Sequence, residues 1–139
     1  MDTGLNAFEE VEHTADWALR VRGRDLAELL VNAARGMSHL LVPDLDAVPT
    51  DVERRIELND LDAESLLVEW LSELAYWAEA ESLVFREFEM LQATADHLEA
   101  VVRGGYAPNL QKHIKAVTYH NLEIIQTESG LETTVVFDV

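Results

Sequence analysis

The sequence predicts an α+β fold, a two-layer domain in which a mostly antiparallel sheet packs against two amphipathic helices. Segments with alternating apolar and polar residues open the chain, two stretches with helical spacing follow, and the second half consists of short strand-like segments. Helices grouped apart from a run of strands are typical of α+β domains. The chain has 139 residues, 48% of them hydrophobic, which is enough for one core. We therefore expect a single domain over residues 1–139.

The first predicted elements are two strands, residues 8–12 and 17–22, joined by a turn. This turn holds Glu12, His13 and Asp16, three ligand-type side chains within five positions. Side chains on a turn reach water from a rigid sheet, as a binding or catalytic site requires. A purely structural interpretation remains open, because Asp and Thr stabilise turns through local hydrogen bonds.

The first helix is expected to follow Asp25, the predicted N-cap with Glu28 three residues later, and to end before Pro43. A loop over residues 44–50 and a strand over residues 52–58 come next. The second helix starts near Asp62, and six residues form its predicted buried face: Leu67, Trp70, Leu71, Leu74, Trp77 and Ala78.

Val68 and Tyr76 lie off the predicted buried face of the second helix. Two interpretations are open: the helix is covered on two sides, or these residues belong to a surface patch for a partner.

The remainder of the chain is predicted to form strands. Their expected ranges are residues 83–92, 97–103, 116–119, 122–127 and 131–138. Residues 104–109 contain two glycines and a proline, which predicts a flexible connection, and residues 128–130 are typical of a tight hairpin turn.

Charge is the most unusual bulk property, since 27 acidic and 10 basic residues give a formal net charge of -17. Direct, tight binding to nucleic acid is not expected, because that affinity comes from Lys and Arg displacing counterions from phosphates. Only Lys112 and Lys115 are lysines. The acidity suits a solvated surface or, alternatively, contact with a basic protein partner.

The sequence also bounds the compartment. It contains no cysteine, which excludes disulfides and thiolate metal sites. Its first residues lack the pattern of a signal peptide, and no apolar run approaches the ~20 residues of a membrane span. We expect a soluble, cytoplasmic protein without membrane contact.

Common catalytic signatures, including Gly-rich phosphate loops, the Gly-x-Ser-x-Gly elbow and the His-Glu-x-x-His zinc motif, are missing from the sequence. Two further segments carry candidate functional residues. Lys115 precedes a short apolar strand that His120 follows, and Asp138 lies beside the α-carboxylate of Val139.

Four segments together resemble the archease family. They are Glu-His-Thr-Ala-Asp at residues 12–16, Leu-Val-Glu-Trp-Leu-Ser-Glu-Leu at 67–74, Ile-Lys-Ala-Val-Thr-Tyr-His at 114–120, and an aspartate before the last aliphatic residue. Their order and approximate spacing match, and the resemblance covers nearly the whole chain. The loop before Ile114 is shorter than is usual in the family, which leaves the contacts of residues 104–113 open.

This resemblance implies a protein that is not itself an enzyme but activates the RNA ligase of tRNA splicing. That ligase joins a 2',3'-cyclic-phosphate or 3'-phosphate RNA end to a 5'-hydroxyl end, and the family promotes its guanylylation and multiple turnover. The resemblance places a divalent metal on Asp16 and Asp138, with Val139 offering a backbone or terminal oxygen. It assigns a functional role to Lys115. We expect His13, in the first of these segments, to be a further functional residue toward the partner.

The expected ligands are hard oxygen atoms, which suit calcium first and magnesium or manganese as alternatives, whereas zinc and copper favour histidine and thiolate. A lone carboxylate binds such ions weakly, so we expect Asp16 and Asp138 to lie together at one end of the sheet. The negative charge would steer the chain toward the basic surface of an RNA-handling enzyme.

Two other functions remain open. One is a stand-alone metal-dependent enzyme acting on phosphorylated substrates, with His13 as acid or base and Lys115 binding the anion. The other is a chaperone-like binding module whose acidic shell and Val68/Tyr76 flank contact a partner.

Overall fold

The computed structural model of the 139-residue chain describes residues 7–12 and 17–139. Its elements are, in order, β1 (Phe8–Glu12), β2 (Trp17–Gly23), α1 (Leu26–Leu41), a 3₁₀ turn (Leu45–Ala47), β3 (Val52–Asn59), α2 (Ala63–Glu81), β4 (Leu83–Ala93), β5 (His97–Tyr106), β6 (Ala116–Thr118), β7 (Ile125–Thr127) and β8 (Gly130–Asp138).

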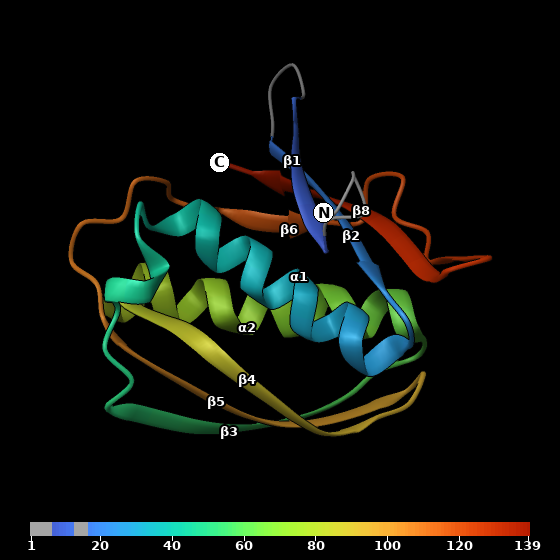
Figure 1. Cartoon of the computed structure of the whole chain (residues 1–139), viewed down its shortest axis with the longest axis horizontal. Helices are drawn as coiled ribbons and strands as arrows, with labels where there is room; N and C mark the ends of the chain where they lie inside the picture. The colour runs from blue at the N-terminus through green and yellow to red at the C-terminus, as the bar shows by residue number, and fades with distance from the viewer. Residues whose placement is uncertain (1–6, 13–16) are drawn as a thin grey trace.

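The strands form two antiparallel sheets. The first has the order β1-β2-β8-β6, with β7 also paired to β8, and the second has the order β3-β5-β4. Both helices lie between the two sheets (Figure 1), where α1 packs against β2 and β4 and α2 contacts β4 and β6. The predicted α+β class, with two helices and antiparallel strands, is confirmed. The arrangement differs from the expected two layers with one sheet, because the strands form two sheets, one on each face of the helical layer.

Both helices begin where the sequence predicts. The Asp25 carboxylate accepts a hydrogen bond from the Glu28 backbone N–H at 2.9 Å, and Asp62 accepts one from Ser65 at 2.8 Å. Glu28 completes a variant of the capping box, because its carboxylate accepts from the backbone N–H of Arg24, one residue before the cap. Local side-chain chemistry therefore fixes both starts.

The core is continuous through the helical layer. Trp70 of α2 is fully buried, and its indole N–H donates to the Leu30 carbonyl of α1 at 2.8 Å, which satisfies the one polar atom of this side chain.

The two residues off the predicted face of α2 differ in exposure. Val68 is buried in the core, whereas Tyr76 is 61% exposed. The helix is thus covered beyond its predicted face at Val68, and only Tyr76 is available at the surface.

The prediction that residues 104–109 form a flexible connection is wrong for its first half. Gly104, Gly105 and Tyr106 belong to β5 and pair with residues of β4. A Cβ at Gly104 would overlap the Val84 carbonyl group, so glycine is required there by the close approach of two backbones. The connection to β6 starts later, after Tyr106.

Two regions between the main elements differ from the sequence prediction. Residues 44–50 include the 3₁₀ turn, and the strand expected over residues 122–127 is restricted to β7. The predicted hairpin turn is confirmed, since Thr127 pairs with Gly130 across Glu128 and Ser129. Gly130 has φ = 129°, a conformation that glycine adopts at low cost.

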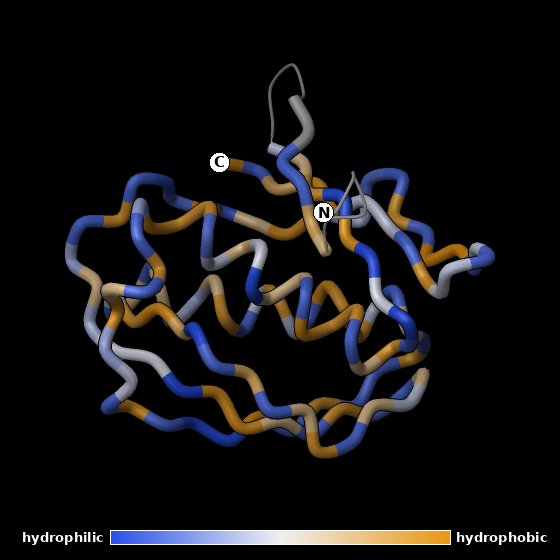
Figure 2. The backbone as a smooth tube through the Cα atoms, viewed as in Figure 1, coloured by the Kyte–Doolittle hydropathy of each residue, from blue (hydrophilic) through white to orange (hydrophobic). Residues whose placement is uncertain are grey.

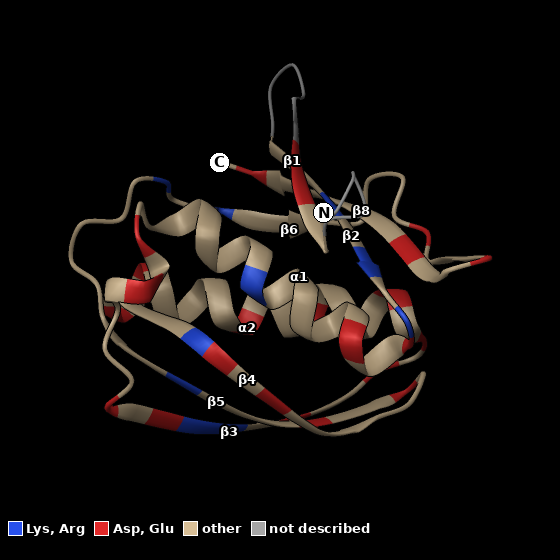
Figure 3. Ribbon diagram, viewed as in Figure 1, with Lys and Arg blue, Asp and Glu red and all other residues tan. Residues whose placement is uncertain are grey.

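The second sheet has one apolar and one polar face. Hydrophobic and hydrophilic residues alternate along β3, β4 and β5 (Figure 2), and the polar positions include charges of both signs (Figure 3). Ile56, Ala100 and Val102 are buried against the helices. None of the helices that the structure describes is long and apolar enough to cross a membrane.

Candidate functional site

Three segments far apart in the sequence meet at one end of the first sheet. Strand β8 lies between β2 and β6, with Trp17 opposite Phe137 and Ala116 opposite Asp138. The Lys115 backbone N–H donates to the Asp138 carbonyl at 2.7 Å, which extends the β6–β8 pairing by one residue. Lys115, Asp138 and the first residue of β2 therefore share one end of this sheet.

Asp16 and His13 lie outside the described residues. The expectation that Asp16 and Asp138 lie together therefore stays a prediction. The strands on either side of residues 13–16 are confirmed, since β1 and β2 pair antiparallel with Glu12 opposite Trp17. Trp17 follows Asp16 in the chain and Phe137 precedes Asp138, and these two neighbours are directly paired.

Lys115 and Asp138 both have exposed side chains. Neither forms an ion pair with another residue of the described ranges, although carboxylates are abundant in this chain. An unpaired cation and an unpaired anion can thus both be presented to solvent at the same sheet end. Val139, which follows Asp138, is half-buried.

A hollow of about 220 Å³ lies between α2 and the segment around Lys115. Its lining includes Tyr76 and Glu79 from α2 and Lys115 and Val117 from the other side. The hollow connects the exposed Tyr76 ring with the lysine, so the two candidate partner-contact residues lie on one continuous surface.

Lys112 differs from Lys115 in its surroundings. Its ammonium group lies over the Trp17 ring and is 3.6 Å from the Glu10 carboxylate of β1. The neighbouring Gln111 donates through its backbone N–H and side chain to the carbonyls of Leu41 and Leu40, at the end of α1. Within residues 104–113, whose contacts the sequence left open, Gln111 therefore binds the end of α1 and Lys112 contacts the β1–β2 pair.

Thr118 is a structural residue of this region that the sequence did not single out. Its hydroxyl donates to the Val136 carbonyl at 3.0 Å and accepts from the His120 backbone N–H at 3.2 Å. This fixes the chain as it leaves β6, and His120 follows directly. Threonine within a short strand gives no sequence signal for such a contact until its partner strand is known.

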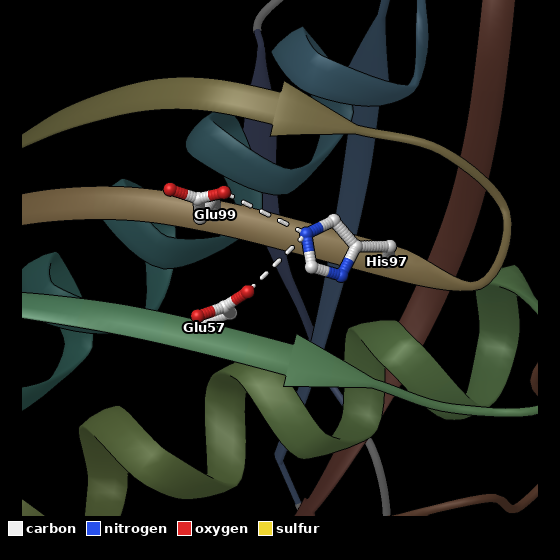
Figure 4. A group of neighbouring side chains, drawn as sticks. All are labelled: Glu57, His97 and Glu99. Carbon is white, nitrogen blue, oxygen red and sulfur yellow. Dashed lines mark ion pairs between the residues drawn. The ribbon is translucent and has the colours of Figure 1, made fainter.

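A second group of ligand-type side chains lies on the polar face of the second sheet. Glu57 of β3 and His97 and Glu99 of β5 bring three potential ligand atoms within 4.8 Å of one another (Figure 4). Sequence analysis missed this group. The only signal in the sequence is that Glu57 and Asn59, and likewise His97 and Glu99, are two positions apart and so share one face of a strand. The group can be recognised only when the β3–β5 register is known.

Comparison with known proteins agrees with the resemblance of the motifs. The sequence model of the archease protein family (MTH1598/TM1083) matches residues 8–139. This chain belongs to the archease family. The match includes the whole described sheet end with Lys115 and Asp138, so these positions lie within the family's own domain.

Individual archease relatives cover almost the full length of both chains. The protein archease of Methanosarcina mazei is 36% identical over 140 residues, with 95% of each chain covered. That of Methanopyrus kandleri is 37% identical over 130 residues, covering 88% of this chain and 91% of its own.

Solved structures share the fold. The solution structure of Methanobacterium thermoautotrophicum protein 1598 superposes with a TM-score of 0.76 at 28% identity, covering 96% of this chain and 99% of that one. The crystal structure of a Thermotoga maritima archease, described as a possible chaperone, gives a TM-score of 0.62 at 22% identity over 94% and 96% of the two chains. The fold is therefore that of archease structures.

Proposed function

We propose that this chain activates the RNA ligase of tRNA splicing, promoting its guanylylation and repeated turnover. The observation that carries the proposal is the meeting of Lys115, Asp138 and the start of β2 at one sheet end. Lys115 and Asp138 belong to two of the segments that resemble archease motifs, and β2 directly follows a third, residues 12–16; the chain belongs to the archease family.

The proposed metal site consists of Asp16 and Asp138, with a backbone or terminal oxygen of Val139. The described part fits a divalent cation, since the Asp138 carboxylate is exposed and has no cationic partner among the described residues. Carboxylate and carbonyl oxygens suit calcium, with magnesium or manganese as alternatives. Such an ion would supply a positive charge at the surface offered to the ligase.

Lys115 is proposed to contact the ligase or its nucleotide, and His13 to act toward the same partner. Lys115 is exposed and its backbone is fixed by the hydrogen bond to Asp138, so its side chain extends from a rigid support. The net charge of -17 would favour approach to a basic surface of the ligase.

The deciding experiment uses a cleaved stem-loop RNA that carries a 2',3'-cyclic phosphate and a 5'-hydroxyl. The tRNA-splicing RNA ligase from the same organism joins these ends with and without this chain. We expect more than one turnover per ligase only when the chain is present. Asp138→Asn and Lys115→Ala are expected to reduce the stimulation by about tenfold, equivalent to about 1.4 kcal/mol.

Asp96→Asn is the matched control, because Asp96 is exposed in the β4–β5 turn of the second sheet and accepts from the Thr94 hydroxyl, as asparagine also can. It should retain full stimulation. Wild-type protein that leaves ligation and guanylylation unchanged would refute the activator function. Hydrolysis of generic phosphoesters by the chain alone with manganese would favour the stand-alone enzyme instead.

A further inference from the structure

The polar face of the second sheet holds a square of four side chains that the function above does not use. Glu57 lies opposite Glu99 and Asn59 lies opposite His97 in the β3–β5 register, and the two residues of each strand are two positions apart. All four side chains therefore project from the same face of the sheet. This face is directed away from the helices.

Two glutamates in direct opposition repel each other, which normally destabilises a cross-strand pair. Arg55 compensates one side, since its guanidinium pairs with Glu99 Oε2. The other side is occupied by the His97 ring, whose Nε2 is 3.7 Å from Glu57 Oε2 and 3.7 Å from Glu99 Oε1 (Figure 4). Because Arg55 and His97 approach different oxygens, Glu99 Oε1 stays available for a second cation.

The orientation of the His97 ring is set by Asn59. Nδ1 of the ring lies 2.7 Å from Asn59 Oδ1, an acceptor, so Nδ1 carries a proton and donates it. In the neutral ring the lone pair is then on Nε2, the atom between the two carboxylates. A hydrogen bond to the far ring nitrogen that fixes the tautomer is the usual support of a metal-binding histidine.

We propose that Glu57 Oε2, Glu99 Oε1 and His97 Nε2 bind a first-row divalent transition ion of the zinc class. Tetrahedral ligands at zinc bond lengths are about 3.4 Å apart. The two 3.7 Å separations from His97 Nε2 are close to this value, and the two carboxylate oxygens, which lie within 4.8 Å of each other, must also close toward it. Imidazole favours zinc, cobalt and nickel over calcium. Three protein ligands leave a fourth position for water or for a group of a partner.

The site differs from the one proposed around Asp138 in ligand chemistry and in place. It lies on the other sheet and contains an imidazole, whereas the Asp138 site offers only oxygen ligands. Its existence therefore does not depend on the proposed function, and each can fail without the other.

The test is titration of the purified, tag-free full chain with Co²⁺, followed by its visible absorption, and then competition with Zn²⁺. We expect one saturable equivalent whose spectrum Zn²⁺ removes and excess Ca²⁺ does not. Asp138→Asn should bind Co²⁺ with unchanged affinity. His97→Ala should weaken it at least about tenfold, and Asn59→Ala by about 10- to 100-fold if the ring orientation matters as in other sites.

His113→Ala is the matched control. His113 is an exposed histidine that also faces a carboxylate, with Nδ1 2.8 Å from Glu79 Oε2, but it has one carboxylate partner where His97 has two. This variant should bind Co²⁺ as the wild type does. Glu57→Gln is a second variant of a proposed ligand that should remain folded, because the Glu57 side chain is 58% exposed and the substitution leaves the core intact.

Wild-type affinity in folded Glu57→Gln and His97→Ala would overturn the proposal, as would the absence of saturable Co²⁺ binding by the wild type. In the latter case His97 serves only as a polar neighbour of the two glutamates. Loss of binding in Glu57→Gln, with retention in His113→Ala, supports the site.

Discussion

The polar face of the second sheet and the Asp138 end of the first sheet both expose charged side chains on paired strands, yet they use them differently. On the second sheet, Arg103 bridges Glu53 at 2.9 Å and Glu89 at 3.2 Å, and neighbouring charges are paired in the same way. At the Asp138 end, Lys115 and Asp138 have no ion-pair partner among the described residues. Charges held together by neighbouring strands stabilise a sheet, whereas unpaired ones are available to a partner.

The test with the largest expected effect on stability removes one buried phenylalanine from each sheet. Phe137 of β8 and Phe85 of β4 are both essentially fully buried. Either Phe→Ala change should lower the free energy of unfolding by about 3–5 kcal/mol, measured by urea denaturation. Phe137 precedes Asp138 and lies between Trp17 and Val117, so only its removal should also disturb the sheet end.

The two variants should therefore separate in the ligation assay, run at a temperature at which circular dichroism shows both to be folded. We expect Phe137→Ala to lose stimulation and Phe85→Ala to keep it. Equal losses would mean that stimulation follows global stability, and the distinction between the two regions would fail.

Gly104 tests a feature that sequence analysis misjudged. Gly104→Ala places a methyl group against the Val84 backbone, which cannot move without breaking the β4–β5 pairing. We expect a loss of about 1–3 kcal/mol, the usual cost of overpacking, in urea denaturation. Ala107→Gly, just beyond β5, controls for a change of one methyl group in the same segment. A Gly104→Ala variant as stable as the wild type would show that these strands separate easily.

Much of the fold was predictable because its causes are local. Asp25 and Asp62 cap their helices through residues three positions later, and apolar periodicity defined the faces that α1 and α2 bury. Gly104 was misassigned because a glycine required by a neighbouring backbone resembles a loop glycine in sequence. Only the paired strand distinguishes the two cases.

The candidate functional residues also differ in whether their signal is local in the sequence or depends on strand pairing. The motif around Lys115 was visible in sequence, and the structure brings it beside Asp138 through β8. The group formed by Glu57, His97 and Glu99 was missed, since α2 and β4 separate β3 from β5 in the chain and spacing within one strand cannot reveal its neighbour. Asp16 and His13 lie outside the described residues, so their roles rest on the motif.

The two lysines offer a smaller and more selective test. Lys112 contacts Trp17 and Glu10, so Lys112→Ala should cost about 0.5–1 kcal/mol in unfolding free energy as a partly exposed cation–π contact is lost. Lys115→Ala should change stability by no more than the ~0–1 kcal/mol of a surface charge. In the ligation assay the order should reverse, with stimulation reduced about tenfold in Lys115→Ala and retained in Lys112→Ala. Full stimulation by Lys115→Ala would return that residue to the ordinary surface charges.

The smallest expected effect concerns the start of α1, remote from both candidate sites. The backbone N–H of Arg24 donates to the Glu28 carboxylate at 2.8 Å, and this hydrogen bond, followed by that of the Arg24 side chain, lowers the pKa of Glu28. Since the folded-state pKa is below the unfolded value of about 4.3, the unfolded chain binds more protons in acid. The contribution of Glu28 to stability is therefore present above that value and is lost as the pH falls through the folded-state pKa.

Glu28→Gln keeps an oxygen that can accept from Arg24 but removes the charge, so it should be less stable than the wild type at pH 7 and approach it as the solution is acidified. Urea denaturation at several pH values measures this difference, and NMR titration of the Glu28 carboxyl carbon measures the pKa directly. Arg24→Ala retains the backbone donor and should preserve most of the lowered pKa. If Arg24→Ala restores an ordinary pKa instead, the side-chain ion pair, rather than the capping hydrogen bond, holds the start of α1.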